Sequence, residues 1–199
     1  MANENFTPED HSWTVRYGFP ADFTQWREFF GDEYNWTSMV PILWQSVDSP
    51  AARILPPKFV PHGFAIETFD PELHKQAWLE LNNRIFIDHP DQGDWAMQDL
   101  ENRMAEPWFD PKGFFLAVEN NQLVGTCWTK IHHDLVNQEP VGELYVVGVN
   151  PDYMGHGIGR AVSIAAMNYL FSKGIREAML YVDADNEKGL KLYESLGFN

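Results

Sequence analysis

From residue 63 onward, hydrophobic and polar positions alternate in patterns typical of short strands and amphipathic helices. Residues 64–69 (FAIETF) alternate with period two, as expected for a strand with one buried face. Glycine and proline set the limits of the other elements, of which four are predicted strands and four are predicted helices. In chain order, they are a strand at 64–69, helices at 71–86 and 95–105, strands at 113–119 and 123–131 joined as a hairpin through 120–122, a strand at 142–149, a helix at 157–173, a strand at 175–182 and a helix at 186–196. This order predicts an α/β fold with a mixed sheet (α+β) and no internal repeat.

The strand predicted at 142–149 carries two further predictions. Gly148 lies inside the strand and is typical of a bulge that splays the sheet. A period of two places Glu143 on one face of the strand, together with Tyr145, Val147 and Val149.

Residues 1–63 differ in character from the rest of the chain. They contain four of the eight tryptophans and end in a Pro-rich stretch at 54–63, which is typical of a linker. Residues 24–30 are predicted to form one short helix, and the aromatic density indicates that the segment packs against something, because disordered tails are poor in aromatics. We therefore expect a short Trp-rich N-terminal extension, or the remnant of a preceding domain, at 1–63 and one domain at 64–199.

Charge excludes one broad class of partner. The chain has 14 basic and 29 acidic residues, a net charge of −15, of which residues 1–140 hold 9 basic and 22 acidic. Such an excess of acid disfavours nonspecific nucleic-acid binding, which depends on Lys and Arg neutralising phosphates. Residues 141–199 are close to neutral, with 5 basic and 7 acidic residues, so that a small anion could still be bound there by backbone N–H groups.

Composition also limits the location and the chemistry. No run of about 18 apolar residues predicts a membrane span, and the N-terminus lacks the basic and apolar regions of a secretory signal, so we expect a cytoplasmic protein without membrane partners. The single cysteine, Cys127, excludes an intramolecular disulfide and is predicted to be a small buried residue. His132, His133 and Asp134 lack further ligands at a metal-binding spacing and are predicted to lie in a solvated loop, so that no metal is expected.

The strongest chemical signal is a glycine-rich turn between a strand and a helix. Gly155, Gly157 and Gly159 alternate at the start of the helix predicted at 157–173. Glycine permits close approach of a ligand, and the first N–H groups of a helix are open to an anion. The spacing matches neither the nucleotide P-loop nor the dinucleotide fingerprint. Taken alone, the motif fits an anion cradle and a flexible connection equally well.

The context of this turn resembles the GNAT superfamily of N-acetyltransferases. The acetyl-CoA loop of that superfamily has the form Gln/Arg-x-x-Gly-x-Gly/Ala, and its last helix carries a Leu-Tyr-x-x-x-Gly-Phe ending like 192–198 here. The first position of the loop is Met154 in this chain. The resemblance covers about 64–199 and implies a GNAT acyl-CoA N-acyltransferase fold with acetyl-CoA as co-substrate. Members of the superfamily usually continue with a final strand, which this chain lacks after its last helix.

A closer resemblance is to the mycothiol synthase family, which acetylates the cysteinyl amine of a cysteinyl-glucosaminyl-inositol. It is carried by six segments in the same order, at 81–84 (LNNR), 89–93 (HPDQG), 105–111 (AEPWFDP), 128–130 (WTK), 142–149 (GELYVVGV) and 180–186 (LYVDADN). The acidic loop and the Trp-Thr-Lys strand are not general features of the superfamily, so they point to the substrate class.

The resemblance implies a role for individual residues. Glu143 would be the base that deprotonates the acceptor amine, and Tyr193 the acid that protonates the leaving thiolate. From the residues alone, a lone Glu143 in an apolar strand is more typical of a sheet-end residue facing water. Tyr193 has the alternative of a half-buried core tyrosine, although the fold favours the catalytic role. Acceptor binding is implied for Asp91, Lys130, Glu143 and Tyr181. Acetyl-CoA binding is implied for Val147, Gly148, Val149, Met154, Gly155, His156, Gly157, Ile158, Gly159, Arg160, Asn186, Lys188 and Lys191.

Three functions therefore remain open at the level of sequence. The first is a mycothiol synthase-like acetyltransferase, and the second is an N-acetyltransferase of another small-molecule amine on the same fold. The third is a noncatalytic acetyl-CoA-binding module. Glu143 and Tyr193 favour the two enzymes, whereas Met154 and the missing final strand favour the third.

Overall fold

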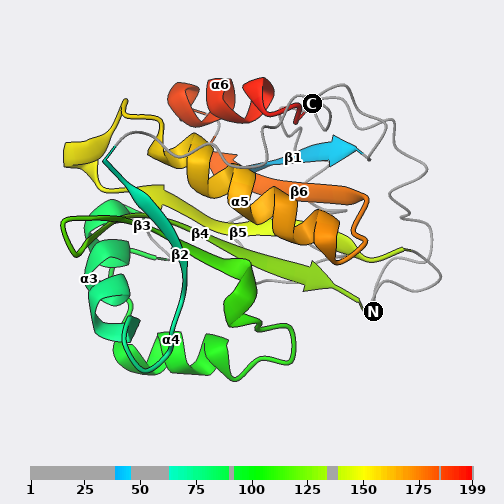
Figure 1. Cartoon of the computed structure of the whole chain (residues 1–199). Coiled ribbons are helices and arrows are strands. Elements are labelled where there is room, and N and C mark those ends of the chain that lie inside the picture. Colours follow the sequence, from blue (N-terminus) through cyan, green and yellow to red (C-terminus); the bar gives the residue numbers. More distant parts are fainter. Residues whose placement is uncertain (1–38, 46–62, 90–91, 134–138, 184, 199) are drawn as a thin grey trace.

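The computed structural model describes the backbone strand at Met39–Gln45 and residues 63–89, 92–133, 139–183 and 185–198. Figure 1 shows a twisted sheet with helices on both sides. The strands are β1 (Met39–Gln45), β2 (Ala65–Thr68), β3 (Phe114–Glu119), β4 (Gln122–His132), β5 (Val141–Val149) and β6 (Glu177–Asp183). The helices are α3 (Lys75–Ile85), α4 (Met97–Met104), α5 (Ile158–Ser172) and α6 (Glu187–Ser195), with short 3₁₀ turns η2 (Pro111–Gly113) and η3 (Pro151–Tyr153).

The six strands form one sheet in the order β1-β6-β5-β4-β3-β2. Neighbouring strands are antiparallel except β5 and β6, which run parallel and are connected through α5. β3 and β4 form the predicted hairpin, and Asn120 and Asn121 at its turn have φ values of 49° and 63°. Asparagine tolerates this left-handed region better than most residues, and such a turn suits the twist of paired strands. The mixed α/β fold is therefore confirmed.

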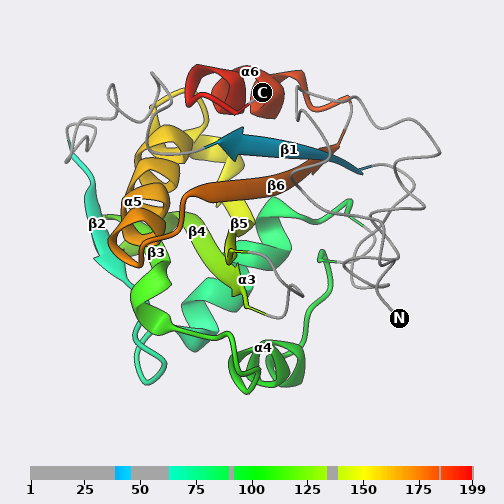
Figure 2. The same ribbon diagram turned by 90° about the vertical axis from the view of Figure 1, so that its right-hand side faces the viewer.

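Among the described residues, a hydrophobic core lies on each face of the sheet. Figure 2 shows α5 on one face and α3 on the other. The core on the α5 side includes Val162, Met167 and Leu180, together with Tyr193 and Phe198 from the C-terminal part. The core on the α3 side is aromatic, and Phe114 stacks on Phe69 and Trp128 with ring centroids 4.3 and 4.5 Å apart. The sheet is thus buried on both sides, which explains the apolar-rich strands of the sequence.

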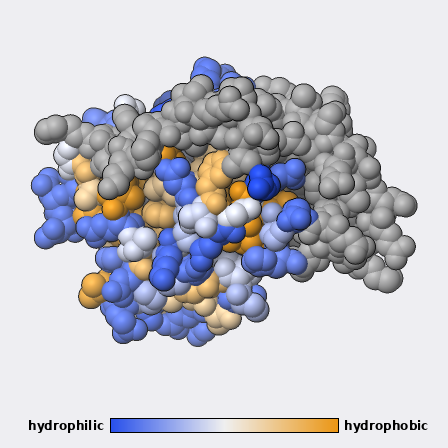
Figure 3. Space-filling model, turned by 45° about the vertical axis from the view of Figure 1, so that its right-hand side comes forward, coloured by the Kyte–Doolittle hydropathy of each residue, from blue (hydrophilic) through white to orange (hydrophobic). Residues whose placement is uncertain are grey.

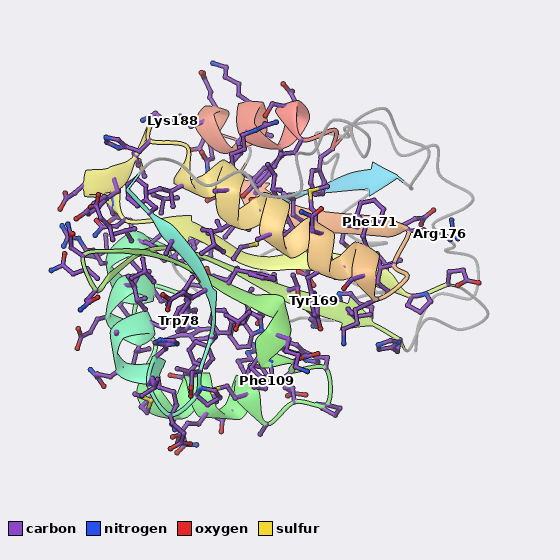
Figure 4. The ribbon with its side chains drawn as sticks, viewed as in Figure 1. Trp78, Phe109, Tyr169, Phe171, Arg176 and Lys188 are labelled. Atoms are coloured by element: carbon purple, nitrogen blue, oxygen red, sulfur yellow. The ribbon has the colours of Figure 1, made fainter. Side chains whose placement is uncertain are left out.

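The predicted helices are present, with shifted limits. The helix expected at 71–86 begins only at Lys75, because Asp70 organises a turn in front of it: its side chain accepts from the backbone N–H of Glu72 and its carbonyl from those of Leu73 and His74. Leu73, which lies inside the range expected for this helix, is 73% exposed. Trp78 of α3 does point toward the sheet, where its Nε1 donates to Thr126 Oγ1 at 3.0 Å (Figure 4).

The bulge in β5 lies at Tyr145 and not at Gly148, so the predicted position was wrong. Trp128 of β4 pairs with Val146, but the next residue of β4 pairs with Leu144, which leaves Tyr145 as an extra residue. Gly148 pairs regularly with Thr126 and is small for another reason. A Cβ there would lie 2.9 Å from Ile85 Cγ2, at the end of α3.

This bulge also corrects the predicted alternation along β5. Glu143 and Tyr145 do share the α3 side of the sheet, where Tyr145 packs against the aromatic core. Val147 and Val149 instead pack against the core on the α5 side. A bulge places two consecutive residues opposite one partner, so the faces exchange after it.

The N-terminal extension contributes the edge strand β1, which the sequence did not predict. β1 runs antiparallel to β6, with Met39 opposite Asp183 and Gln45 opposite Glu177. The edge of β6 is thereby covered along its whole length. The helix predicted at 24–30 and residues 54–62 of the linker predicted at 54–63 lie outside the described residues.

Two surface properties complete the fold. On the face drawn in Figure 3, hydrophilic residues predominate and the hydrophobic ones form small separate groups. None of the helices in the described part of the chain combines the length and the hydropathy of a membrane-spanning helix.

Candidate active site

The parallel strands β5 and β6 separate in the middle of the sheet. They pair only from Val141 to Glu143, against Glu177 to Met179. Beyond Glu143, β5 continues beside β4 alone, while β6 continues beside β1. No strand in the described part of the chain pairs with the β6 side of β5 at Val147–Val149, so the backbone there could bind an extended ligand, as at a sheet edge.

The glycine-rich turn lies where β5 leads into α5. Gly155 and Gly157 have φ values of 83° and 79°, in the left-handed region that favours glycine, and Gly157 is the N-cap of α5. The N-cap glycine has no side chain with which to cap the helix, so the backbone N–H groups of the first turn lie at the positive end of the helix dipole without a bond from their own N-cap. A Cβ on Gly155 would meet no atom within 4 Å. The turn is thus shaped to receive an anion such as a diphosphate.

The other predicted coenzyme residues surround this turn with different roles. Met154 is 51% exposed, and the exposed His156 Nδ1 lies 3.1 Å from the carbonyl of Tyr153. Arg160 Nη1 donates to Ser195 Oγ at 2.7 Å, which ties α5 to the end of α6. These contacts leave the main chain of the turn as the candidate anion-binding element.

Helix α6 carries the remaining predicted coenzyme residues. The Asn186 side chain accepts from the backbone N–H of Gly189 at 2.9 Å, so its observed role is to cap α6. Lys191 pairs with Glu187 at 3.4 Å and both are largely exposed. Lys188 is exposed on the same helix (Figure 4). The two lysines supply positive charge on the surface of α6.

Glu143 is completely buried next to the point where β5 and β6 separate. Its Oε2 lies 2.8 Å from Nε2 of His132, and the side chains are 0% and 8% exposed. The sequence placed His132 in a solvated loop, but it is the last residue of β4 and faces the same side of the sheet as Lys130. The alternative of a water-facing Glu143 is therefore wrong.

Lys130 lies opposite Glu143 in the β4–β5 pairing and is enclosed by aromatic rings. Its Nζ lies 5.1 Å from the ring centroid of Trp108 and 5.4 Å from that of Tyr145, within the range of cation–π attraction. The Trp108 and Tyr145 rings contact each other edge to face at 5.2 Å. The rings of Trp108 and Tyr145, here called the aromatic box, thus surround the buried amine of Lys130 beside the buried carboxyl group of Glu143.

Tyr193 lies on the other face of the sheet, in the core on the α5 side. Burial, and in addition the nearby Cys127, raise the pKa of its phenol well above the ordinary range. Cys127 pairs with Val147 in the strand ladder, so Tyr193 lies near the part of β5 that has separated from β6. Cys127 is buried, as predicted, and this burial raises the pKa of its thiol.

The structure thus gathers some of the predicted acceptor residues and leaves one undescribed. Glu143 and Lys130 are cross-strand neighbours, and the half-buried Tyr181 of β6 lies on the same face by the alternation with Leu180 and Val182. Asp91 lies outside the described residues. In the described part of the chain, no group of three or more His, Cys, Asp or Glu side chains is arranged to hold a metal.

Comparisons with known proteins agree with this geometry. Residues 75–198 match the model of the Acetyltransferase (GNAT) family. The chain is 48% identical over 157 residues to a protein of Thermobispora bispora named "Mycothiol acetyltransferase", covering 78% of this chain and 53% of that protein. It is 49% identical over 151 residues to the protein of that name from Thermomonospora curvata, covering 76% and 48%. The chain spans about half the length of these relatives.

Solved structures show the same fold. A GCN5-related N-acetyltransferase from Sphaerobacter thermophilus superposes with a TM-score of 0.66 at 25% identity, covering 81% of this chain and 48% of that chain. An aminoglycoside N-acetyltransferase in complex with CoA superposes with a TM-score of 0.57 at 25% identity, covering 71% and 92%. The separated strands, the glycine turn and the family match lead to one conclusion, that this chain belongs to the Acetyltransferase (GNAT) family.

Proposed function

We propose that this protein is an N-acetyltransferase that moves the acetyl group of acetyl-CoA to the cysteinyl amine of a cysteinyl-glucosaminyl-inositol, the last step of mycothiol formation. The observation that carries the proposal is the buried Glu143 at the point where β5 and β6 separate, on the strand that leads into the glycine turn. The names of the relatives support the acceptor class.

Acetyl-CoA supplies the acetyl group as a thioester. The main chain of Gly155–Ile158 would hold its diphosphate, and the unpaired edge of β5 around Val147–Val149 would hold its extended arm by backbone hydrogen bonds. The surface lysines Lys188 and Lys191 would add positive charge for the phosphates. The residues present fit this ligand, because the turn offers backbone donors and open space at Gly155.

Glu143 would act as the base. The acceptor amine arrives mainly as an ammonium, and one Glu143 oxygen takes its proton, so that the nitrogen lone pair can attack the carbonyl carbon of the thioester. Tyr193 would act as the acid. Its raised pKa keeps the phenol protonated at neutral pH, and its proton goes to sulfur as the carbon–sulfur bond breaks. The second proton of the attacking nitrogen returns to the Tyr193 phenolate through solvent, and Glu143 releases its proton to water, so that both groups are regenerated.

The acceptor would bind on the α3 side of the sheet. Lys130, Glu143 and Tyr181 present a cation, a carboxylate and a hydroxyl on that face, which are the groups that recognise a polyhydroxylated amine. The Trp108–Tyr145 pair orients Lys130 and offers flat apolar surface to a sugar ring.

A thiol-release assay tests the proposal. Acetyl-CoA is combined with cysteinyl-glucosaminyl-inositol, with an aminoglycoside such as sisomicin, and with a peptide that begins with alanine. We expect kcat/KM to be highest by at least about tenfold, or 1.4 kcal/mol, for the first acceptor. Preference for another amine would replace the acceptor class, and no turnover despite acetyl-CoA binding would indicate the noncatalytic module.

A further inference from the structure

His132 is the partner of Glu143, and nothing in the family resemblance assigns it a role. It ends β4 opposite Val141, and its Nε2 lies 2.8 Å from Glu143 Oε2. Both side chains are buried, with exposures of 8% and 0%. An ionised carboxylate can only accept, so with Glu143 in the ionised form that a base requires, the ring nitrogen facing it carries the hydrogen and His132 Nε2 is the donor.

Such a contact has two physical consequences for a base. A carboxylate removed from water is costly unless hydrogen bonds or opposite charge compensate it. A glutamate also has three rotatable side-chain bonds, so a fixed donor on one oxygen restricts where the other oxygen lies. Strand pairing fixes the backbone of His132, so the imidazole is a rigid donor.

We propose that His132 is a positioning residue for Glu143, holding Oε2 so that Oε1 is presented to the ammonium of the acceptor. This inference rests on the proposed role of Glu143 as the base. The ammonium proton moves to Oε1, the amine lone pair becomes free, and His132 stabilises the carboxylate before that transfer without itself touching the substrate.

Other ionisable groups face the same region and bear on its pH dependence. On β4 they are Lys130 and His132, on β5 Tyr145, and on β6, by alternation, Glu177, Tyr181 and Asp183. Lys130 is held by the aromatic box. If His132 had a purely structural role, it would only complete the packing of this cluster. Its substitution would then lower kcat by the same factor at every pH.

The test compares substitutions that differ in the donor. His132→Leu removes the hydrogen-bond donor to Glu143. His132→Asn carries its amide donor on a shorter side chain that ends farther from Glu143, and His132→Gln places an amide N–H₂ at about the position of Nε2. We expect kcat with acetyl-CoA and cysteinyl-glucosaminyl-inositol, or with the best acceptor of the panel, to fall about 10- to 100-fold for Leu and Asn and less than about threefold for Gln. Acetyl-CoA affinity, measured by calorimetry, should not change. If the His132→Leu variant does not fold, the comparison of kcat between His132→Asn and His132→Gln tests the proposal.

Two further readouts separate positioning from structure. The fall in kcat caused by His132→Leu should be smaller at pH 9 than at pH 7, because more of the acceptor amine is already neutral at the higher pH. His132→Leu combined with Glu143→Gln should be no slower than Glu143→Gln alone, because residues that act through one another are not additive. A pH-independent loss, additive effects, or no rescue by Gln would overturn the inference. A fully active Glu143→Gln single variant would instead refute Glu143 as the base.

Discussion

Gly155 allows the coenzyme turn to be tested apart from the stability of the fold. Its φ is 83° and a Cβ would meet nothing within 4 Å, so Gly155→Ala introduces backbone strain without a clash. An L-residue in this region costs about 1–2 kcal/mol. For a protein of this size, 1 kcal/mol corresponds to a fall in Tm of roughly 2–4 °C. The space into which the methyl group projects is the space proposed for the diphosphate.

Gly174 provides a matched control at the opposite end of α5. Its φ is 80°, and a Cβ there would also meet nothing within 4 Å. Gly155→Ala and Gly174→Ala should therefore lose similar stability in thermal melts. Only Gly155→Ala should weaken acetyl-CoA binding in calorimetry, by about tenfold or more, which is 1.4 kcal/mol. Equal affinities for the two variants would refute the assignment of the diphosphate to this turn.

Three more predictions concern the chemistry and the core. Tyr193→Phe should lower kcat about 10- to 100-fold at unchanged acetyl-CoA affinity. The control variant Tyr169→Phe on α5 should keep its kcat, and an equal fall in kcat for both variants would exclude Tyr193 as the acid. Trp108→Leu removes one wall around Lys130 and should raise the acceptor KM several-fold at constant acetyl-CoA affinity; an unchanged KM would exclude the box from acceptor binding. Because burial raises the pKa of Cys127 and Tyr193, the folded state keeps protons that the unfolded chain releases, so stability should fall as pH rises above about 9. In denaturant titrations, Cys127→Ala should reduce the decrease in the free energy of unfolding between pH 9 and pH 10. An unchanged decrease would contradict this role of the buried thiol.

Much of the fold could be predicted because its elements are defined locally. The helix α5 has a glycine at each end and an apolar face, and the hairpin between β3 and β4 turns at two asparagines. The edge strand β1 could not be predicted from its own residues, since pairing with β6 joins segments more than 130 residues apart. The position of the bulge at Tyr145 could not be predicted for a similar reason, because a bulge depends on the pairing of two strands and not on one strand alone.

The candidate site was predicted unevenly. Glu143 and Lys130 came from the family resemblance, and the structure brings them together across β4 and β5. His132 was missed because the predicted strand ended one residue early, at Ile131. The period-two series Thr126, Trp128, Lys130 could have been extended to His132, but alternation alone does not distinguish a buried strand end from an exposed one.

The most direct measurement is the identification of the product. The protein is incubated with acetyl-CoA and cysteinyl-glucosaminyl-inositol, and the product is examined by mass spectrometry and NMR. We predict one added acetyl group on the cysteinyl nitrogen, with the free thiol of coenzyme A released in equal amount. No acetylated product, or an acetyl group on another atom of the acceptor, would contradict the proposed function.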